Sequence, residues 1–301
     1  MDGIINVYKE AGYTSFDVVA KLRGILKQKK IGHTGTLDPD AEGVLPVCIG
    51  KATKLCEYLT AKDKIYQAVL HLGITTDTQD LSGRILREQT PEISEENLRQ
   101  ILKHFIGRQK QVPPMYSALK VNGKKLCDLA RQGVEVERKA REIEIFSIEV
   151  LSAELPRVTL SIHCSKGTYI RTLCQDIGEM AGCGGCLEKL WRIRSGRFSI
   201  QDAYKLAEIE AVAFGNSSKG LKLSDILLPL DLVLEEYPKI FAAAGTEKIL
   251  YNGGRLSVSK VKQNVEILSG IYRMYDAGGV FVGLFRYDER RQEFLPEKMF
   301  L

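Results

Sequence analysis

The sequence predicts an α+β protein, with a mixed, mostly antiparallel central sheet in residues 1–236 and a small β-barrel in residues 237–301. The chain has 301 residues, enough for one large domain or two ordinary ones. Up to about residue 235, predicted helices and strands lack the strict alternation of parallel-sheet proteins. After Tyr237 and Pro238, short strand-like segments are separated by glycine pairs, as in small barrels. So small a barrel has little stability alone, and we expect it to pack on the first domain.

The first domain combines predicted strands with three predicted helices, which do not alternate regularly. Ser15 is the expected N-cap of a helix over 16–26, with Phe16, Val19, Ala20 and Leu22 on its apolar face. Ser94 is expected to cap a second helix, because Leu98, Ile101, Leu102 and Phe105 recur at helical spacing. Residues 169–180 return to this spacing. The predicted strands are 3–9, 44–49, 66–72, 142–151 and 158–164, the last two forming a pair.

The C-terminal region contains one predicted helix, over 245–251, among five short strands. These strands are predicted at 256–258, 265–268, 271–275, 280–286 and 294–298.

The composition is that of a globular protein. Hydrophobic residues make up 44% of the chain and charged residues 27%, which excludes collagen-like, mucin-like and wholly disordered chains. Its apolar runs are far shorter than the roughly 20 residues of a membrane span. The N-terminus lacks the basic flank and apolar core of a signal peptide. We therefore expect a cytoplasmic protein without a membrane partner, and a monomer.

The seven cysteines are scattered along the chain, which favours reduced thiols over a disulfide framework. Cys183 and Cys186 have the CxxC spacing of zinc sites, but a closed site needs four ligands and no second pair accompanies them. We interpret this segment as a glycine-rich turn and expect no metal.

Positive charge is concentrated in parts of the chain. Between residues 108 and 142, nine lysines and arginines stand against four acidic residues, a local net charge of +5 that equals that of the whole chain. Two smaller basic clusters lie at 21–30 and 189–197. Such clustering in an otherwise balanced chain favours a polyanion partner such as nucleic acid.

The richest candidate for chemistry is the loop GHTGTLDP at residues 32–39. Gly32 and Gly35 permit tight turns, and Pro39 disfavours helical backbone at Asp38, so that its carboxylate extends from a loop. A fixed loop that carries His33 and Asp38 is a common setting for catalysis.

The same segment, GHTGTLDPDAEGVLPVCIGKATK at residues 32–54, closely resembles the catalytic signature of the TruB family of tRNA pseudouridine synthases. Further similarities follow in order over nearly the whole chain, although Glu10 stands where the family usually has proline. They are residues 3–15, Lys64-Ile-Tyr66, residues 75–83, QVPPMYSALK at 111–120, CSKGTYIRTL at 164–173 and LWRIRSG at 190–196. Residues 252–256 and 275–284 resemble a PUA-type RNA-binding domain more weakly.

The resemblance implies a pseudouridine-synthase catalytic domain over 1–236, followed by a PUA-like module over 237–301. It assigns Asp38 as the essential carboxylate, Arg171 as its partner, and Tyr66 to stacking on the target base and to proton transfer. Three further residues would line the uridine pocket or hold the displaced T-loop: His33, Tyr169 and Leu190. Residues 108–142 would form a mobile thumb whose basic side chains, Lys120 among them, contact tRNA phosphates.

The implied reaction, isomerisation of uridine 55 in the T-arm of tRNA, agrees with the chemistry of these residues. An N-glycosidic bond is broken and the same base is rejoined through carbon, so no redox cofactor, metal or ATP is needed. The Asp38 carboxylate would either form a covalent adduct or remove the C2′ proton, and the sequence leaves both routes open. A nearby arginine would keep this carboxylate ionised. The target base must leave its stack, which requires aromatic and apolar walls.

Two alternatives come from other functional classes. A non-catalytic tRNA-binding chaperone or scaffold of the same fold would bind RNA without turnover, and the presence of both Asp38 and Arg171 disfavours it. A hydrolytic nucleosidase usually needs paired carboxylates or a metal, and no second acid stands out beside Asp38. Asp80 is interpreted as a turn residue.

Overall fold

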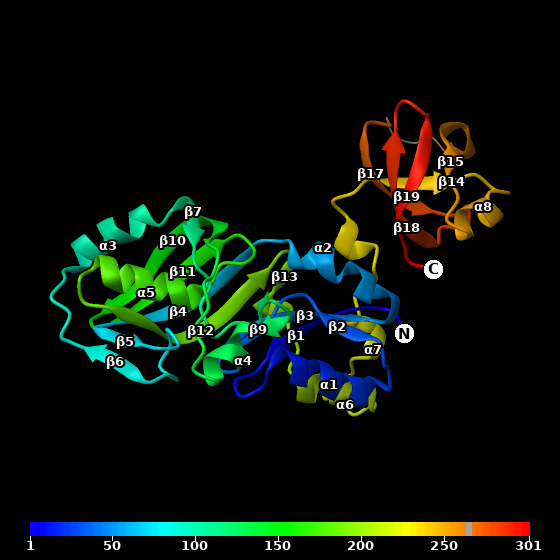
Figure 1. The fold of residues 1–301 in the computed structure, drawn as a ribbon. Helices are drawn as coiled ribbons and strands as arrows, with labels where there is room; N and C mark the ends of the chain where they lie inside the picture. The colour runs from blue at the N-terminus through cyan, green and yellow to red at the C-terminus, as the bar shows by residue number, and fades with distance from the viewer. Residues whose placement is uncertain (263–266) are drawn as a thin grey trace.

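The computed structural model describes residues 1–262 and 267–301, which form two large sheets and two two-stranded hairpins, with helices around the larger sheet. Figure 1 shows the larger sheet running through the left and centre of the molecule, and the smaller sheet as a separate module at the upper right. Both chain ends lie on the side of this module (Figure 1). An α+β fold with a barrel-like C-terminal module is confirmed.

The central sheet has nine strands, in the order β1-β3-β12-β4-β11-β10-β7, with β2 beside β3 and β13 beside β12. These strands are β1 (Gly3–Lys9), β2 (Ile31–His33), β3 (Glu42–Ile49), β4 (Lys64–Leu72), β7 (Gly107–Gln111), β10 (Arg141–Glu154), β11 (Arg157–Cys164), β12 (Gly185–Ser195) and β13 (Phe198–Ser199). Two hairpins project from it: β5 (Ile74–Thr76) with β6 (Ile85–Glu88), and β8 (Lys120–Val121) with β9 (Lys124–Lys125). The helices of this part are α1 (Ser15–Leu26), α2 (Cys56–Thr60), α3 (Glu95–His104), α4 (Leu126–Arg131), α5 (Ile170–Met180), α6 (Leu206–Ala213) and α7 (Leu223–Ile226).

One parallel contact joins the two halves of this otherwise antiparallel sheet. β3 runs parallel to β12, with Gly43 opposite Arg192, and every other pairing in the sheet is antiparallel. Gly43 has φ +104°, and a Cβ there would lie 2.4 Å from the carbonyl oxygen of Arg192. Any side chain at this position would push the strands apart, so glycine is required for the join.

The helix α1 begins one residue earlier than predicted. Thr14 is its N-cap, in a capping box with Asp17, while the side chain of Ser15 is buried and bonded to Leu37. The expected apolar face is also partly wrong, because Phe16 is 65% exposed and Ala20 is exposed, whereas Val18 is buried beside Val19 and Leu22.

The remaining predicted elements of this part are confirmed within one or two residues at most ends, and β10 extends further. Ser94 caps α3 by accepting a hydrogen bond from the main-chain N–H of Asn97 (3.2 Å). Helices α3 and α5 contribute to the core on the β4–β11 half of the sheet, and α1 and α6 to the core beside β1 and β3.

The C-terminal sheet has the strand order β15-β19-β18-β17-β14-β16. Its elements are β14 (Lys239–Ala242), α8 (Glu247–Tyr251), β15 (Leu256–Ser257), β16 (Val261–Lys262), β17 (Gly270–Tyr275), β18 (Phe281–Asp288) and β19 (Glu293–Met299). Four of the five predicted strands and the helix are present, whereas β14 and β16 were not predicted. The strand predicted at 265–268 lies partly outside the described residues, and the described residues 267–268 are not in a strand.

As expected, this module packs on the larger part of the chain. Leu284 and Phe300 share a buried cluster with Val44 and Leu55. The Nζ of Lys54 also donates to the main-chain oxygen of Met299 (2.8 Å). In residues 1–262 and 267–301, no helix has the length and apolar character needed to cross a membrane.

Candidate active site

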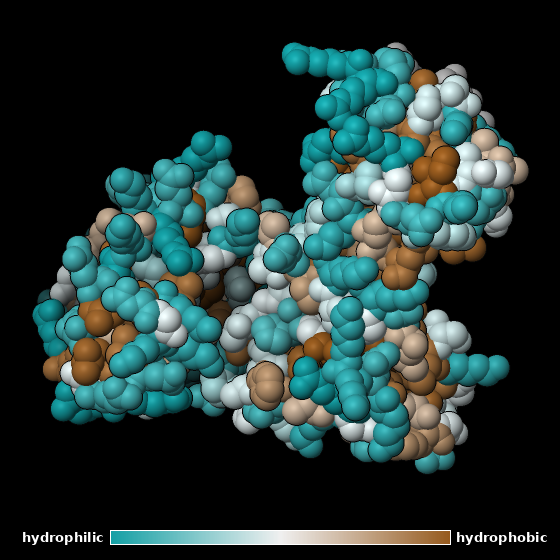
Figure 2. Space-filling model, turned by 45° about the vertical axis from the view of Figure 1, so that its right-hand side comes forward, coloured by the Kyte–Doolittle hydropathy of each residue, from teal (hydrophilic) through white to brown (hydrophobic). Residues whose placement is uncertain are grey.

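Two adjoining cavities open between the loop that follows β2 and the N-terminus of α5. Their volumes are about 310 Å³ and 740 Å³. The residues lining both include Asp38, Ser117, Arg171 and Leu190. In Figure 2, a hollow with brown and pale walls lies between the left lobe and the middle of the molecule, and hydrophilic side chains surround it.

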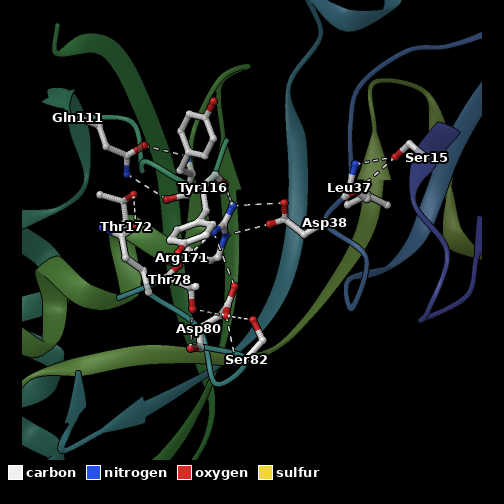
Figure 3. A network of polar contacts seen from close by, with 12 residues as sticks. Ser15, Leu37, Asp38, Thr78, Asp80, Ser82, Gln111, Tyr116, Arg171 and Thr172 are labelled. Atoms are coloured by element: carbon white, nitrogen blue, oxygen red, sulfur yellow. Dashed lines mark hydrogen bonds and ion pairs between the residues drawn. The ribbon is translucent and has the colours of Figure 1, made fainter. Parts of the chain in front are cut away.

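The loop that carries Asp38 is held in place from two sides. On one side, Ser15 Oγ accepts a hydrogen bond from the main-chain N–H of Leu37 (2.9 Å), as Figure 3 shows. On the other, the guanidinium of Arg192 donates to the main-chain oxygens of Val44 (2.7 Å), Gly35 (3.2 Å) and Thr36 (3.4 Å). A guanidinium offers five donors in a fixed plane, so Arg192 fixes the loop relative to β3. Only 1% of Arg192 is exposed.

Arg171 joins this loop to three other segments. Its Nε lies 2.9 Å from Oδ2 of Asp38, and its Nη2 donates to Oδ1 of the same carboxylate (3.3 Å). The guanidinium also donates to the main-chain oxygens of Thr78 (3.0 Å) and Tyr116 (2.8 Å). Figure 3 shows Arg171 at the centre of this network, with Asp38 on one side and Tyr116 on the other.

A second carboxylate, Asp80, lies on the Thr78 side of Arg171. Its Oδ2 is 3.7 Å from Nη1 of Arg171, and its Oδ1 accepts hydrogen bonds from Thr78 Oγ1 (2.7 Å) and from Ser82 Oγ (2.6 Å). Asp80 is therefore the turn residue that was expected, and it also adds negative charge beside Arg171. No pattern in the sequence indicates this second contact, because residues 80 and 171 belong to distant segments.

The surroundings of the site shift the pKa of its carboxylate and keep its phenol and imidazole rings uncharged. Loss of solvation in the cavity raises the pKa of Asp38, and the guanidinium of Arg171 opposes this rise. Burial raises the pKa of Tyr66 and of Tyr169, so both phenols stay protonated at neutral pH. Burial lowers the pKa of His33, with Arg192 adding to the effect, so the imidazole is neutral.

Five of the seven predicted site residues line the smaller cavity: Asp38, Tyr66, Tyr169, Arg171 and Leu190. His33 is not among the lining residues of the described cavities; its Nδ1 accepts a hydrogen bond from the N–H of Gly35 (3.3 Å) within the loop. Lys120 is exposed at the start of the β8–β9 hairpin, also outside the lining.

The basic segment reaches the cavities through other residues. Ser117, Ala118 and Leu119 line the smaller cavity, while Cys127 and Arg131 of α4 line the larger one. The lysines of the hairpin, Lys120, Lys124 and Lys125, are exposed to solvent.

Sequence reasoning missed several polar residues of the site. Lys64 lines the smaller cavity and donates to the main-chain oxygen of Thr60 (2.7 Å); burial lowers its pKa to about 8. The alternation along β4, in which Lys64 shares a face with Tyr66 and Ala68, was a signal that it is buried. The hydroxyl of Ser117 is buried without a hydrogen-bond partner in the described structure, and no local pattern marks it.

The described residues contain no cluster of three side chains suited to hold a metal ion. All seven cysteines are free thiols, and Cys183 and Cys186 flank a turn in which Gly184 has φ +75°.

The chain matches two family models that together span most of the larger part. Residues 23–170 match the TruB family pseudouridylate synthase N-terminal domain, and residues 171–235 match the tRNA pseudouridylate synthase B C-terminal domain. The tRNA pseudouridine synthase B of Lachnoclostridium phytofermentans is 48% identical, with 100% of each chain covered. That of Clostridium kluyveri is 44% identical over 94% of this chain and 95% of its own.

Solved structures of related proteins have a similar fold. A Cbf5-Nop10-Gar1 complex contains a chain that is 27% identical, with a TM-score of 0.75, covering 99% of this chain and 85% of that one. An H/ACA RNP bound to a substrate RNA containing 2′-deoxyuridine gives 25% identity and a TM-score of 0.74 over the same shares.

Proposed function

The chain belongs to the TruB family of pseudouridine synthases, and from this premise we propose that it converts uridine 55 in the T-arm of tRNA into pseudouridine. As a tRNA pseudouridine synthase it is an isomerase. The N1–C1′ bond of the uridine is broken and C5 of the same base becomes bonded to C1′. The proton at C5 is released and N1 takes up a proton, so that the product is an isomer of the substrate. The observation that carries the assignment of the site is the pair of contacts between Arg171 and Asp38 at the wall of a cavity that can hold one nucleotide.

In this proposal the ionised carboxylate of Asp38 acts on the ribose of a flipped-out nucleotide. Formation of an adduct at C1′ and removal of the C2′ proton both begin with the ionised form, which Arg171 favours. The neutral ring of Tyr66 supports the base by stacking, and Leu190 and Tyr169 enclose it. His33 accepts a hydrogen bond within the loop that carries Asp38 and lies outside the cavity lining. In this proposal it would hold the displaced T-loop rather than contact the target base.

The larger cavity adjoins the smaller one at Asp38 and would receive the nucleotides next to the target. Basic side chains of the segment 108–142, the thumb, would contact phosphates on the same side. Residues 237–301 would act as a PUA-like module that extends the RNA-binding surface beyond the catalytic domain of residues 1–236. We further propose that the enzyme acts as a monomer.

The decisive experiment maps pseudouridine in an unmodified tRNA transcript after treatment with the purified protein. We expect one new pseudouridine, at position 55 of the T-arm, together with tritium release from tRNA labelled at uridine C5. A product at another position would contradict the T-arm assignment. Binding of tRNA without tritium release would instead support the scaffold alternative, and free uracil would indicate hydrolysis.

A further inference from the structure

Gln111, the last residue of β7, forms two hydrogen bonds with the main chain of Tyr169 through the oxygen and the nitrogen of its side-chain amide. Its Nε2 donates to the main-chain oxygen of Tyr169 (3.1 Å), and its Oε1 accepts from the N–H of the same residue (2.8 Å). The side chain thus reproduces the pair of hydrogen bonds that a neighbouring strand would make. Gln111 is 5% exposed, so these bonds are shielded from water.

Tyr169 is the N-cap of α5, and no side chain caps this helix. The first turn of the helix carries Arg171, two residues further on. The orientation of this turn sets the position of the guanidinium that holds Asp38. The clamp by Gln111 therefore acts on the backbone from which both the Tyr169 ring and Arg171 extend.

The same short segment is tied to α5 a second time. Five residues after Gln111, the main-chain oxygen of Tyr116 accepts from Nη2 of Arg171 (2.8 Å). Pro113 and Pro114 lie between these two attachment points, and each proline ring fixes φ near −65°. The base of the thumb is thus a stiff bridge that is bonded at both ends to the start of α5.

We infer that Gln111 is a positioning residue: by clamping the main chain of Tyr169, it holds Arg171, and through Arg171 the Asp38 carboxylate, at the angle that the reaction needs. The inference rests on the proposed roles of Asp38 and Arg171. It requires one donor and one acceptor at the end of the side chain, in a fixed order, because Tyr169 presents one carbonyl and one N–H.

This requirement makes Gln111→Glu an informative variant. The ionised glutamate has no donor, so one of its oxygens would face the carbonyl of Tyr169 and repel it. The protonated acid, by contrast, has one O–H and one carbonyl oxygen, as the amide has one donor and one acceptor facing Tyr169. Two cations face this position, Arg141 opposite residue 111 on β10 and Arg171 at the start of α5, and both favour the ionised form. Because residue 111 is almost fully buried, we expect loss of solvation to dominate, so that protonation begins above the ordinary pKa of about 4.3.

Single-turnover rates at saturating tRNA, measured from pH 8 down to about pH 5.5, test the inference. Displacements of about 1 Å cost about 100-fold in rate, so we expect Gln111→Glu to be roughly 10- to 100-fold slower than the unaltered protein at pH 8. The ratio of the two rates should approach one as the pH falls. Gln111→Ala should be slow at every pH, with a tRNA Kd within about threefold of normal, because phosphate contacts supply most of the affinity.

Gln109→Glu is the matched control. Gln109 lies two residues earlier on β7, and its Nε2 also donates to a main-chain oxygen, that of Phe105 (2.7 Å), away from α5. Its rate relative to the unaltered protein should not change with pH. A pH-independent ratio for Gln111→Glu, or an equal loss of rate in the Gln109 and Gln111 variants, would overturn the inference.

Melting curves at each pH identify any variant that fails to fold. If Gln111→Glu is unfolded at pH 8, the test rests on Gln111→Ala: a normal rate for this variant, when it is folded, is sufficient to overturn the inference. Asp38→Asn distinguishes failure of the proposed site from failure of the role of Gln111. If Asp38→Asn retains its rate, the proposed site is wrong. If it is inactive while both Gln111 variants react normally, only the inference about Gln111 fails.

Discussion

Arg171 meets Asp38 with two nitrogens: Nε lies 2.9 Å from one carboxylate oxygen, and Nη2 lies 3.3 Å from the other. The arginine side chain is 6% exposed and that of the aspartate 44%. The cation is therefore enclosed by protein, while the carboxylate still faces the cavity. This paired geometry fixes the rotation of the carboxylate as well as its charge.

Asp38→Asn should abolish isomerisation and leave tRNA affinity nearly unchanged. The amide can neither attack the sugar nor remove a proton, whereas phosphate contacts elsewhere supply most of the affinity. Tritium release and filter binding with the same labelled tRNA measure both properties. Near-normal turnover in this variant would remove Asp38 from the mechanism.

Arg171→Lys should be much slower at saturating tRNA although it keeps the positive charge. An ammonium cannot hold both carboxylate oxygens in one plane and also reach the main-chain oxygens of Thr78 and Tyr116. Single-turnover rates should fall by about 100-fold, with a small change in Kd. A rate within about threefold of normal, roughly 0.65 kcal/mol, would show that charge alone is sufficient. Melting curves serve as the control for folding.

The rate of isomerisation should fall at acidic pH, and this acid limb should lie at a higher pH than the ordinary pKa of an aspartate. Because burial raises the pKa of Asp38 above 3.8, the reactive carboxylate is lost, as the pH falls, at a higher pH than for an exposed aspartate. Replacing Arg171 with Met removes the charge that opposes this rise, so the limb should move to still higher pH. Single-turnover pH profiles of the two proteins, recorded where both remain folded, give the comparison. An acid limb at or below the ordinary aspartate value would contradict the prediction.

Joint replacement of Lys120, Lys124 and Lys125 by Ala should weaken tRNA binding and its dependence on salt. All three are exposed on the β8–β9 hairpin. The slope of log affinity against log salt should fall by roughly 0.7 to 0.9 for each phosphate that one of these lysines neutralises. Lys103→Ala on α3, an exposed lysine outside the segment 108–142, is the control and should leave the slope unchanged. If the triple variant keeps the full slope, the hairpin faces solvent in the complex.

Lys64→Met should alter how the stability of the protein depends on alkaline pH. The pKa of Lys64 is lowered from 10.5 to about 8, so between these values the unfolded chain binds more protons than the folded one. Stability from this group therefore rises with pH in that range. The unfolding free energy of the unaltered protein should increase relative to the variant by about 1–3 kcal/mol between pH 8 and pH 10. Urea denaturation at several pH values measures it, and parallel curves would contradict the expected burial. Lys9, whose pKa is lowered in the same way, is present in both proteins and cancels.

Local patterns in the sequence determined about half of the elements. Alternation of side chains located β4 and β11, and the spacing of Leu98, Leu102 and Phe105 located α3. These patterns succeed because one face of each element is buried, and burial repeats with the period of the backbone. They failed for β14 and β16, whose two to four residues are too few to show a period. They also failed for β12, in which two register shifts interrupt the alternation of buried and exposed side chains.

The sequence indicated some residues of the candidate site, and the tertiary structure revealed the others. Asp38 stood out in its loop, and the resemblance to TruB enzymes pointed to Arg171, Tyr66, Tyr169 and Leu190, which the structure gathers around one cavity. Local sequence could not show that Ser15 would not be the N-cap of α1, and that its hydroxyl would instead accept a hydrogen bond from the main chain of Leu37. Thr14 supplies a complete capping box, so the hydroxyl of Ser15 is free for a contact 22 residues away.

Only the tertiary structure placed Gln111, Asp80 and Arg192 in the site. Gln111 contacts Tyr169, 58 positions away, and Asp80 contacts Arg171, 91 positions away. Arg192 contacts the loop before β3, more than 140 positions away. The Arg192 contact depends on the parallel join of β3 to β12 at Gly43, and the Gln111 contact on the place of β7 beside β10. A hydrogen bond between a side chain and a distant main-chain group leaves no periodic trace in either segment. The sequence by itself therefore pointed to the residues that carry the proposed chemistry, and the tertiary structure decided which residues hold them in place.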